Sequence, residues 1–248
     1  MHLLKHGELL ADPLAAYADV DRSSPGGPCW VMAHMVGGLD GSAAIAGRVS
    51  ELSTAPDGEL FQLMRTLADV VLVGAETVRR EGYGAVRLPP ERARGRVSAG
   101  KPATPPLAIV SGSLRFDWTA RAFVDPPEGS RTIVITTESS DIERRESAAD
   151  AATVIVAGNN RVDPRAALHH LAGAGHHVVL CEGGPRLLGE LVAEDLVDEL
   201  CLTISPLMGG DPLPVSVTPP GSPLRRFQLR QAAGDGDTLF LRYERGPR

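Results

Sequence analysis

The sequence predicts one α/β domain whose mostly parallel sheet is covered by helices on both faces. Short, entirely apolar segments such as 70–73 and 178–181 are typical of strands buried on both faces of a sheet. They alternate with segments of helical periodicity, as parallel β-α-β connections require. The last two expected strands, 227–231 and 238–244, have no helix between them, so we expect an antiparallel pair there.

The composition bounds the class of protein. The 248 residues are 43% hydrophobic and include 27 glycines and 20 prolines, which suits one loop-rich α/β domain. No apolar run reaches the ~18–20 residues of a membrane span, and we expect no secretory signal. The three cysteines form no CxxC pair, which favours free thiols in a reducing cytoplasm. A net charge of −6 gives no field that attracts nucleic acid.

The first half of the chain alternates strand and helix patterns. We expect residues 1–27 to be a leader packed on the fold and residues 28–248 to form the domain. Apolar side chains at helical spacing predict a helix over 57–68, with Asp57 as its N-cap. Residues 82–106 carry prolines and arginines without a period and predict a long surface loop. The other elements expected here are strands at 30–36, 70–73 and 107–110 and a short helix at 76–81.

The second half continues the alternation. Asp163-Pro164 predicts the start of a helix, because Asp can cap it and Pro fits its first turn. The further elements expected are strands at 132–136, 153–157, 178–181 and 200–205 and helices at 138–149 and 185–193.

The sharpest local motif is Cys181-Glu182-Gly183-Gly184-Pro185, between an apolar strand and a helix. Its two glycines permit a close approach of the backbone, and the free N–H groups of the helix suit a pyrophosphate. A tight strand-to-helix turn, in which the glycines have only a structural role, is an equal alternative. A second turn of this kind holds Gly74 and Thr77, and open α/β sheets bind ligands where such turns meet. Neither turn matches a Rossmann or Walker motif.

Three further residues have both a functional and a structural interpretation. Asp40 lies in a glycine-rich loop, where a simple Asp-Gly turn is common. Arg65 could remain on the surface or reach a substrate phosphate. His34 lies inside an apolar strand, where a wall histidine is usual and a catalytic acid is the rarer case. The histidine pairs at 169–170 and 176–177 lack metal-ligand spacing, so we expect no metal site.

Four motifs in order make residues 28–245 resemble the reductase domain of the bifunctional riboflavin-biosynthesis deaminase/reductase. They are Gly38-Leu39-Asp40-Gly41, the run from Arg65 to Val78, Glu182-Gly183-Gly184-Pro185-Arg186-Leu187, and Leu196-Val197-Asp198-Glu199-Leu200. Residues 81–87 are also similar to stand-alone members. The zinc deaminase motif, H-x-E with P-C-x-x-C, is absent from this chain.

The resemblance implies a dihydrofolate-reductase-like α/β/α fold, NADPH as cofactor and a homodimer formed through the C-terminal strands. It implies hydride transfer to C1′ of 5-amino-6-(5-phosphoribosylamino)uracil, with Glu182 or a bound water as proton donor and Asp40 in reserve. The residues expected at the cofactor are Gly74, Thr77, Glu81, Ser111, Gly112, Gly183, Gly184, Pro185 and Leu187. Those expected at the substrate are His34, Ser50, Arg65, Arg87 and Glu182, with Arg65 at its phosphate.

Two positions depart from the family pattern. His34-Met35 stands where many relatives carry a lysine, and Gly38 replaces the serine of the Ser-Leu-Asp-Gly segment. Both changes fall on the substrate side of the expected crevice. Reduction of dihydrofolate or another pterin therefore stays open, as does an NADPH-binding module without turnover.

Overall fold

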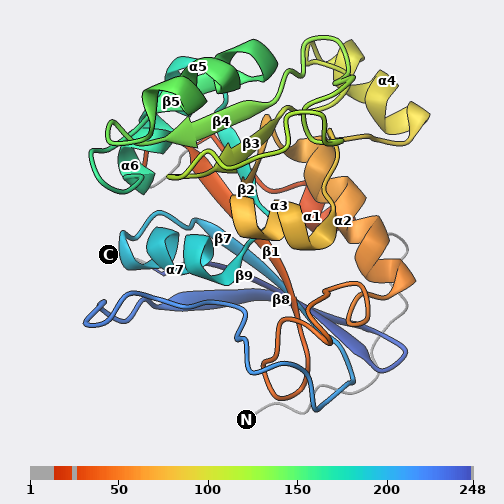
Figure 1. Cartoon of the computed structure of the whole chain (residues 1–248). Coiled ribbons are helices and arrows are strands. Elements are labelled where there is room, and N and C mark those ends of the chain that lie inside the picture. The colour runs from red at the N-terminus through yellow and green to blue at the C-terminus, as the bar shows by residue number, and fades with distance from the viewer. Residues whose placement is uncertain (1–13, 24–26, 247–248) are drawn as a thin grey trace.

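The computed structural model describes residues 14–23 and 27–246, and one twisted sheet runs through it (Figure 1). Its order is β5-β4-β3-β2-β6-β1-β7-β9-β8. All neighbouring pairs from β5 to β7 are parallel, and β9 and β8 then add as antiparallel strands. The strands are β1 Trp30–Gly37, β2 Val70–Gly74, β3 Leu107–Val110, β4 Ile133–Thr136, β5 Thr153–Val156, β6 Val178–Cys181, β7 Glu199–Ile204, β8 Phe227–Asp235 and β9 Thr238–Arg245.

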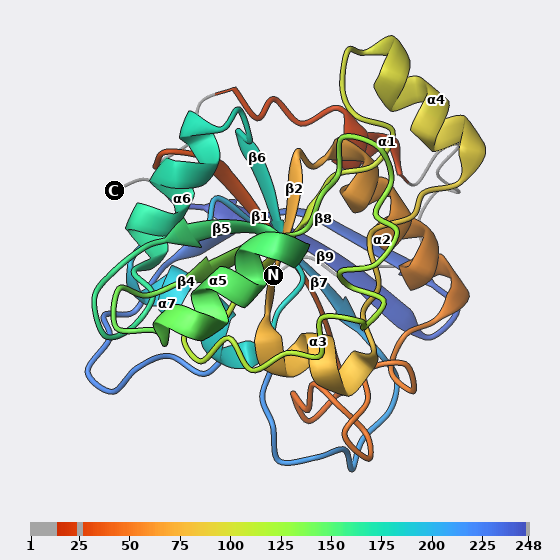
Figure 2. The same cartoon turned by 45° about the horizontal axis from the view of Figure 1, so that its top comes forward.

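Helices cover both faces of the sheet (Figures 1 and 2). Apolar residues of α1, α2, α3 and α5 belong to the core on one face, and those of α6 and α7 belong to the core on the other. The three-layer α/β/α architecture of the dihydrofolate-reductase-like fold is thereby confirmed. The helices are α1 Ala15–Ala18, α2 Ala55–Leu67, α3 Ala75–Glu81, α4 Pro90–Ser98, α5 Ile142–Ala151, α6 Pro164–Gly173 and α7 Pro185–Ala193.

Side chains alternate along β1, and this alternation determines which of them point to each face of the sheet. Val31, Ala33 and Met35 enter the core beneath α6 and α7, whereas Met32 enters the core beneath α2. His34 therefore shares the α2 face of the sheet with Met32. This placement brings a polar side chain of a central strand against a helix rather than into solvent.

The prediction of a long surface loop over 82–106 is wrong, because this segment contains α4. The helix begins with Pro90 at its first turn and has no continuous apolar face, so hydrophobic periodicity does not reveal it. It is held instead by Arg96, whose buried guanidinium donates to the carbonyls of Thr66, Ala68 and Pro102. The arginine thus ties α4 to the end of α2.

The expected N-cap of α2 is also wrong. The helix begins at Ala55 after Thr54, and no side chain caps it. Asp57 lies inside the first turn and is buried, so its carboxylate faces the sheet. By contrast, Asp163 caps α6 as expected, accepting hydrogen bonds from the backbone N–H groups of Arg165 and Ala166.

Part of the expected leader lies outside the described residues, namely 1–13 and 24–26. Of the described part, Tyr17 is buried in the core beneath α2. Arg22 pairs with the fully buried carboxylate of Glu199, with Nε 2.9 Å from Oε2. Among the described helices, none is long and apolar enough to cross a membrane.

Candidate active site

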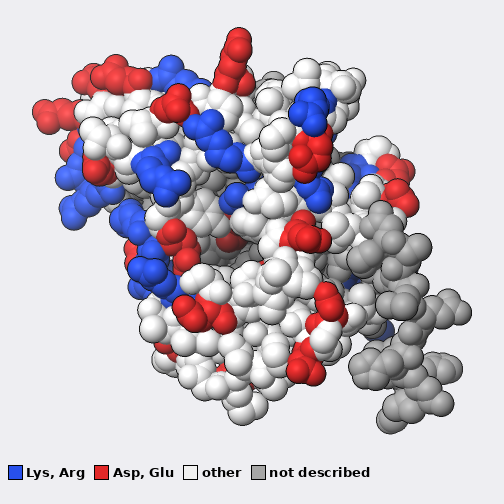
Figure 3. Space-filling model, turned by 90° about the vertical axis from the view of Figure 1, so that its right-hand side faces the viewer, with Lys and Arg blue, Asp and Glu red and all other residues white. Residues whose placement is uncertain are grey.

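A cleft of about 1070 Å³ opens at the carboxyl ends of the central strands. Its walls come from the ends of β1, β2 and β6, from α2 and α3, and from the first turn of α7. This is the edge at which open α/β sheets bind ligands. A hollow lies near the centre of the face drawn in Figure 3, with acidic and basic side chains on its rim.

The two glycine turns meet on one wall of the cleft. The Gly74 N–H donates to the Gly183 carbonyl over 3.0 Å, which joins the end of β2 to the end of β6. Gly183 has φ +91°, a conformation that side chains rarely adopt. A Cβ on Gly184 would lie 2.6 Å from Thr77 Oγ1, so any side chain there would close the gap between the turns. The turns form a narrow backbone cradle beside the start of α7.

Glu182 is held in one position by its neighbours. Arg65 donates to both of its oxygens, from Nε at 2.6 Å and Nη2 at 2.8 Å, and Tyr83 donates to Oε2 at 3.0 Å. Burial and the Glu182 carboxylate raise the pKa of the Tyr83 phenol well above its usual value, so Tyr83 stays a neutral donor. The guanidinium also lies 4.1 Å from the ring centre of Phe61. The carboxylate of Glu182 thus accepts three hydrogen bonds, two of them from a cation.

His34 and Asp57 form a second buried polar group in the cleft wall. His34 Nε2 lies 3.3 Å from Asp57 Oδ1, an ion-pair distance, although the ring is not aligned for a hydrogen bond. The hydroxyls of Ser53 and Thr203 both donate to the Asp57 carboxylate over 2.6 Å. Burial raises the pKa of Asp57, but His34 and these hydroxyls outweigh it, and the pKa lies below its usual value. Asp57 is therefore ionised.

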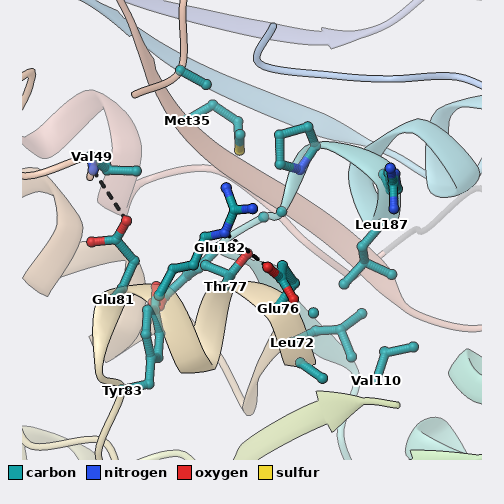
Figure 4. Close-up of a pocket in the computed structure, with 18 of the residues that line it drawn as sticks. Met35, Val49, Leu72, Glu76, Thr77, Glu81, Tyr83, Val110, Glu182 and Leu187 are labelled. Atoms are coloured by element: carbon teal, nitrogen blue, oxygen red, sulfur yellow. Dashed lines mark hydrogen bonds and ion pairs between the residues drawn. The ribbon is translucent and has the colours of Figure 1, made fainter. Parts of the chain in front are cut away.

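Most of the residues expected at the ligands line the cleft. Glu81 also accepts a hydrogen bond from the backbone N–H of Val49 at 3.1 Å (Figure 4). Met35 and Leu187 lie across the cleft from Glu81 in the same view. The expected residues in the lining are His34, Ser50, Gly74, Thr77, Glu81, Ser111, Gly112, Glu182, Gly183, Gly184, Pro185 and Leu187.

Three expected residues do not line the cleft. Asp40 is exposed, and its carboxylate accepts from Ser42 and from the Gly209 N–H, which lowers its pKa and organises the loop. Arg65 stands behind Glu182, so a phosphate contact from Arg65 would compete with their ion pair. Arg87 lies at the surface and donates to the carbonyl of Asp125. The structure thus supplies no observation in favour of a direct ligand contact by these three side chains.

Three residues of the site were not anticipated from the sequence. Tyr83 anchors Glu182, Asp57 holds His34, and Arg161 lines the cleft beyond the end of β5. Asp57 carried a usable signal, since it lies three residues before Leu60 on the buried side of the helix pattern. No group of three metal-ligating side chains occurs among the described residues.

The cleft fits an extended dinucleotide. Its volume exceeds the upper range of ordinary small-molecule pockets. The cradle of Gly183 and Gly184 leaves room that a Cβ would fill, and the first N–H groups of α7 have no acceptor within their own helix. These features suit a pyrophosphate lying across the strand ends.

Comparison with known proteins points the same way. The chain is 26% identical over 219 residues to the 2,5-diamino-6-ribosylamino-4(3H)-pyrimidinone 5′-phosphate reductase of Archaeoglobus fulgidus, covering 87% of this chain and 99% of that one. It is 29% identical to the enzyme of the same name from Methanothermobacter thermautotrophicus, covering 83% and 93%. The crystal structure of a pyrimidine reductase-like protein from Corynebacterium diphtheriae superposes with a TM-score of 0.80 at 27% identity, covering 96% of both chains.

The fold, the cleft and these relatives define an oxidoreductase of the riboflavin-biosynthesis class, whose members take a hydride from a nicotinamide cofactor. Within that class, the chain belongs to the RibD C-terminal domain family, whose model matches residues 29–241.

Proposed function

We propose that this protein uses NADPH to reduce a ribosylaminopyrimidine 5′-phosphate at C1′ of its ribosyl group. The observation that carries the proposal is the cradle of Gly183, Gly184 and Thr77 at the carboxyl edge of the sheet. It lies in the same cleft as the buried polar groups around Glu182 and His34. Relatives named as pyrimidinone phosphate reductases support the substrate class.

The preference for NADPH over NADH rests on Arg161. This exposed residue lies between β5 and α6 and lines the cleft. Its guanidinium makes no hydrogen bond or ion pair with another described residue. The neighbouring Ser111 and Gly112 lie at the end of β3 on the same side of the cleft. A free guanidinium there can bind the 2′-phosphate that distinguishes NADPH from NADH.

The protein's own contribution to the reaction is alignment. When bound, the cofactor supplies the hydride that reduces C1′ of the open-chain imine. The glycine cradle fixes one partner. Ser50, Tyr83 and Glu182 line the space for the other. Holding two partners in a reactive geometry can contribute ~7–11 kcal/mol.

Two pyrimidines are compatible with this proposal. The sequence pattern favours the aminouracil, whereas the archaeal relatives are named for the diaminopyrimidinone. Both carry the same ribosylamino phosphate and differ at one ring substituent. Discrimination between the two substrates therefore requires the cleft to distinguish a carbonyl from an amino group on that ring.

A direct assay tests the function. Purified protein is mixed with NADPH or NADH and with either pyrimidine phosphate or dihydrofolate, and cofactor oxidation is followed by absorbance. Mass spectrometry should show a ribityl product that has gained two hydrogens from one of the pyrimidines. Turnover of dihydrofolate alone would overturn the substrate class, and cofactor binding without any turnover would make the chain a binding module.

A variant tests the cofactor preference. Arg161→Ala should raise the Michaelis constant for NADPH roughly tenfold, as expected for a lost charge-assisted contact, and should leave that for NADH unchanged. Arg165→Ala, on the first turn of α6 outside the cleft lining, is the matched control. Equal effects on both cofactors would remove Arg161 from the proposal.

A further inference from the structure

The two carboxylates expected from the sequence as proton donors are both engaged in other contacts. Both oxygens of Glu182 already accept hydrogen bonds from Arg65 and Tyr83. Asp40 lies outside the cleft lining, and its hydrogen bonds favour the charged form. The reduction of an imine nevertheless requires one proton for each hydride, and a positioned side chain is the usual source.

His34 occupies the right place for this task. Its partner in β7 is Cys201, and Ala33 pairs with Cys181 of β6. One step further along both parallel strands, His34 comes beside Glu182 on the same face of the sheet. His34 therefore lies next to the residue that follows β6, and it lines the cleft itself.

The groups around His34 place one buried carboxylate and one aromatic ring against the imidazole. From α2, Asp57 presents a buried carboxylate 3.3 Å from Nε2, and the Phe61 ring packs 5.6 Å away between centres. On β7 the neighbour is Cys201, which is a buried thiol. On β6 the charge of Glu182 is already balanced by Arg65. The Asp57 carboxylate is therefore the anion beside His34 that can stabilise an imidazolium, as in other His–carboxylate pairs.

The other ring nitrogen is available to a ligand. Nδ1 makes no hydrogen bond to another described residue, and it is not among the fully buried polar atoms that lack a partner. Because His34 lines the cleft and its Nε2 lies beside the Asp57 carboxylate, Nδ1 is the ring nitrogen left for a ligand in the cleft.

We propose that His34 is the catalytic proton donor and that Asp57 is its positioning residue. The inference rests on the proposed function. Hydride addition to C1′ moves the C=N π electron pair onto the nitrogen, which takes the proton from Nδ1 of the imidazolium. The cofactor is oxidised, the imine becomes a secondary amine, and the neutral imidazole is reprotonated from solvent.

Asp57 is itself built into this arrangement. Thr203 and Ser53 donate to separate oxygens of its carboxylate, from β7 and from the loop before α2. A buried carboxylate costs stability unless it is satisfied, and here every contact holds it as an anion aimed at His34. The pair thus joins a central strand to the helix that covers it.

The experiment compares His34→Asn, His34→Lys and Asp57→Asn with wild type, and uses the exposed His170→Asn as control. Loss of a general acid should lower kcat about 100-fold in His34→Asn, with little change in either Michaelis constant. The wild-type kcat should fall as pH rises and the imidazolium loses its proton, and this limb should disappear in His34→Asn. His34→Lys should recover part of kcat, with its limb displaced to higher pH.

A second readout does not depend on turnover. In ¹⁵N NMR of the protein without substrate, the protonated fraction of His34 at a given pH should fall in Asp57→Asn. An active wild type whose kcat and pH profile survive in folded His34→Asn would overturn this inference and leave the proposed function intact. An inactive wild type would instead count against the proposed function, and an unchanged His34 titration in Asp57→Asn would remove Asp57 from its role.

Discussion

At the scale of single residues, Gly184 and Thr77 set how closely a ligand can approach the turn between β6 and α7. The absent side chain at 184 leaves the Thr77 hydroxyl facing the cradle. The backbone of Gly184 is extended, with φ −67° and ψ 175°, so alanine is conformationally acceptable there. Space rather than backbone conformation therefore makes glycine necessary at this position.

Gly184→Val should weaken NADPH binding on the order of tenfold or more, because it fills the cradle and pushes the pyrophosphate from the helix end. Fluorescence titration of the purified variant measures this. Thr77→Ala combined with Gly184→Ala relieves the clash with Thr77 Oγ1 but still occupies the cradle, so it should stay weak. Gly173→Ala, which meets open space, is the control. Unchanged binding in folded Gly184→Val would contradict the placement of the cofactor.

Arg65→Ala should both destabilise the protein and impair substrate use. It leaves the buried Glu182 carboxylate without its cation, which typically costs about 3–5 kcal/mol. The Michaelis constant for the pyrimidine phosphate should rise, because Arg65 positions Glu182 in the cleft wall. Denaturant unfolding and steady-state kinetics measure the two effects. The double variant Arg65→Met with Glu182→Gln should recover much of the lost stability, because it leaves no unpaired buried charge. If the double variant is as unstable as Arg65→Ala, loss of the ion pair is not the cause of the destabilisation.

The sequence located the ligand-binding turns but not their electrostatic partners. Glu182, Gly183 and Gly184 stand together in the chain, so a local motif reveals them. The pairing of Glu182 with Arg65 joins residues far apart in sequence and depends on how α2 packs on the sheet. His34 was expected as a substrate contact, but its partner Asp57 was expected to cap a helix. The preference of Asp for helix N-caps predicted a local role for Asp57, but in the packed structure Asp57 contacts His34 instead.

At the scale of elements, apolar periodicity predicted most of the strands and helices that form the core, with ends shifted by a few residues. It missed α1, which contributes Tyr17 to the core. It failed at α4, which is held by hydrogen bonds from Arg96 rather than by an apolar face. It also placed the start of α5 too early, because Asp141 rather than an earlier residue caps that helix by accepting from Arg144 N–H. Polar contacts over long separations leave no period in the sequence.

Asp69 illustrates how one carboxylate aligns two strands. It precedes β2, accepts from the N–H groups of His177 and Val178 at the start of β6, and pairs with Lys101 at 2.7 Å. Burial raises the pKa of Asp69, but Lys101 and the two N–H groups outweigh it, so the pKa lies below its usual value. The stabilisation is therefore present above the unfolded-state pKa and is lost as pH falls through the folded-state pKa.

Asp69→Asn should lower the free energy of unfolding at neutral pH on the order of 1.5 kcal/mol, as expected for hydrogen bonds to a charged group. The difference from wild type should shrink in acid, as the pH falls through the lowered folded-state pKa and the wild-type carboxyl also gains a proton. Urea unfolding at several pH values measures it, with the exposed Asp150→Asn as control. A difference that does not depend on pH would contradict this account.

At the scale of the whole molecule, the C-terminal strands leave an apolar face uncovered. Leu229 of β8 and Leu239 of β9 are 51% and 49% exposed. Leu229 pairs with Tyr243, which is an even number of residues from Leu239, so both leucines lie on one face. Exposed apolar area of this kind marks an interaction site, and a second copy of the chain is the partner that we predict.

Wild-type protein should sediment as a dimer, and Leu239→Arg should sediment as a monomer, because it places a charge on that apolar face. Analytical ultracentrifugation at several protein concentrations measures the equilibrium. Leu224→Arg is the control, since Leu224 is fully exposed and lies outside β8 and β9. A monomeric wild type, or a dimer that tolerates Leu239→Arg, would contradict this interface.

The strand order also governs the sequence of events during synthesis. β1 emerges early, yet its neighbours are β6 and β7, with Trp30 beside Val178 and Met32 beside Glu199. Until those late segments leave the ribosome, the apolar strand that carries His34 has neither of its native partners. Such distant pairings slow folding and prolong exposure to aggregation. A nascent chain halted before residue 178 should thus depend on chaperones, while its β2–β3–β4 pairing is already possible.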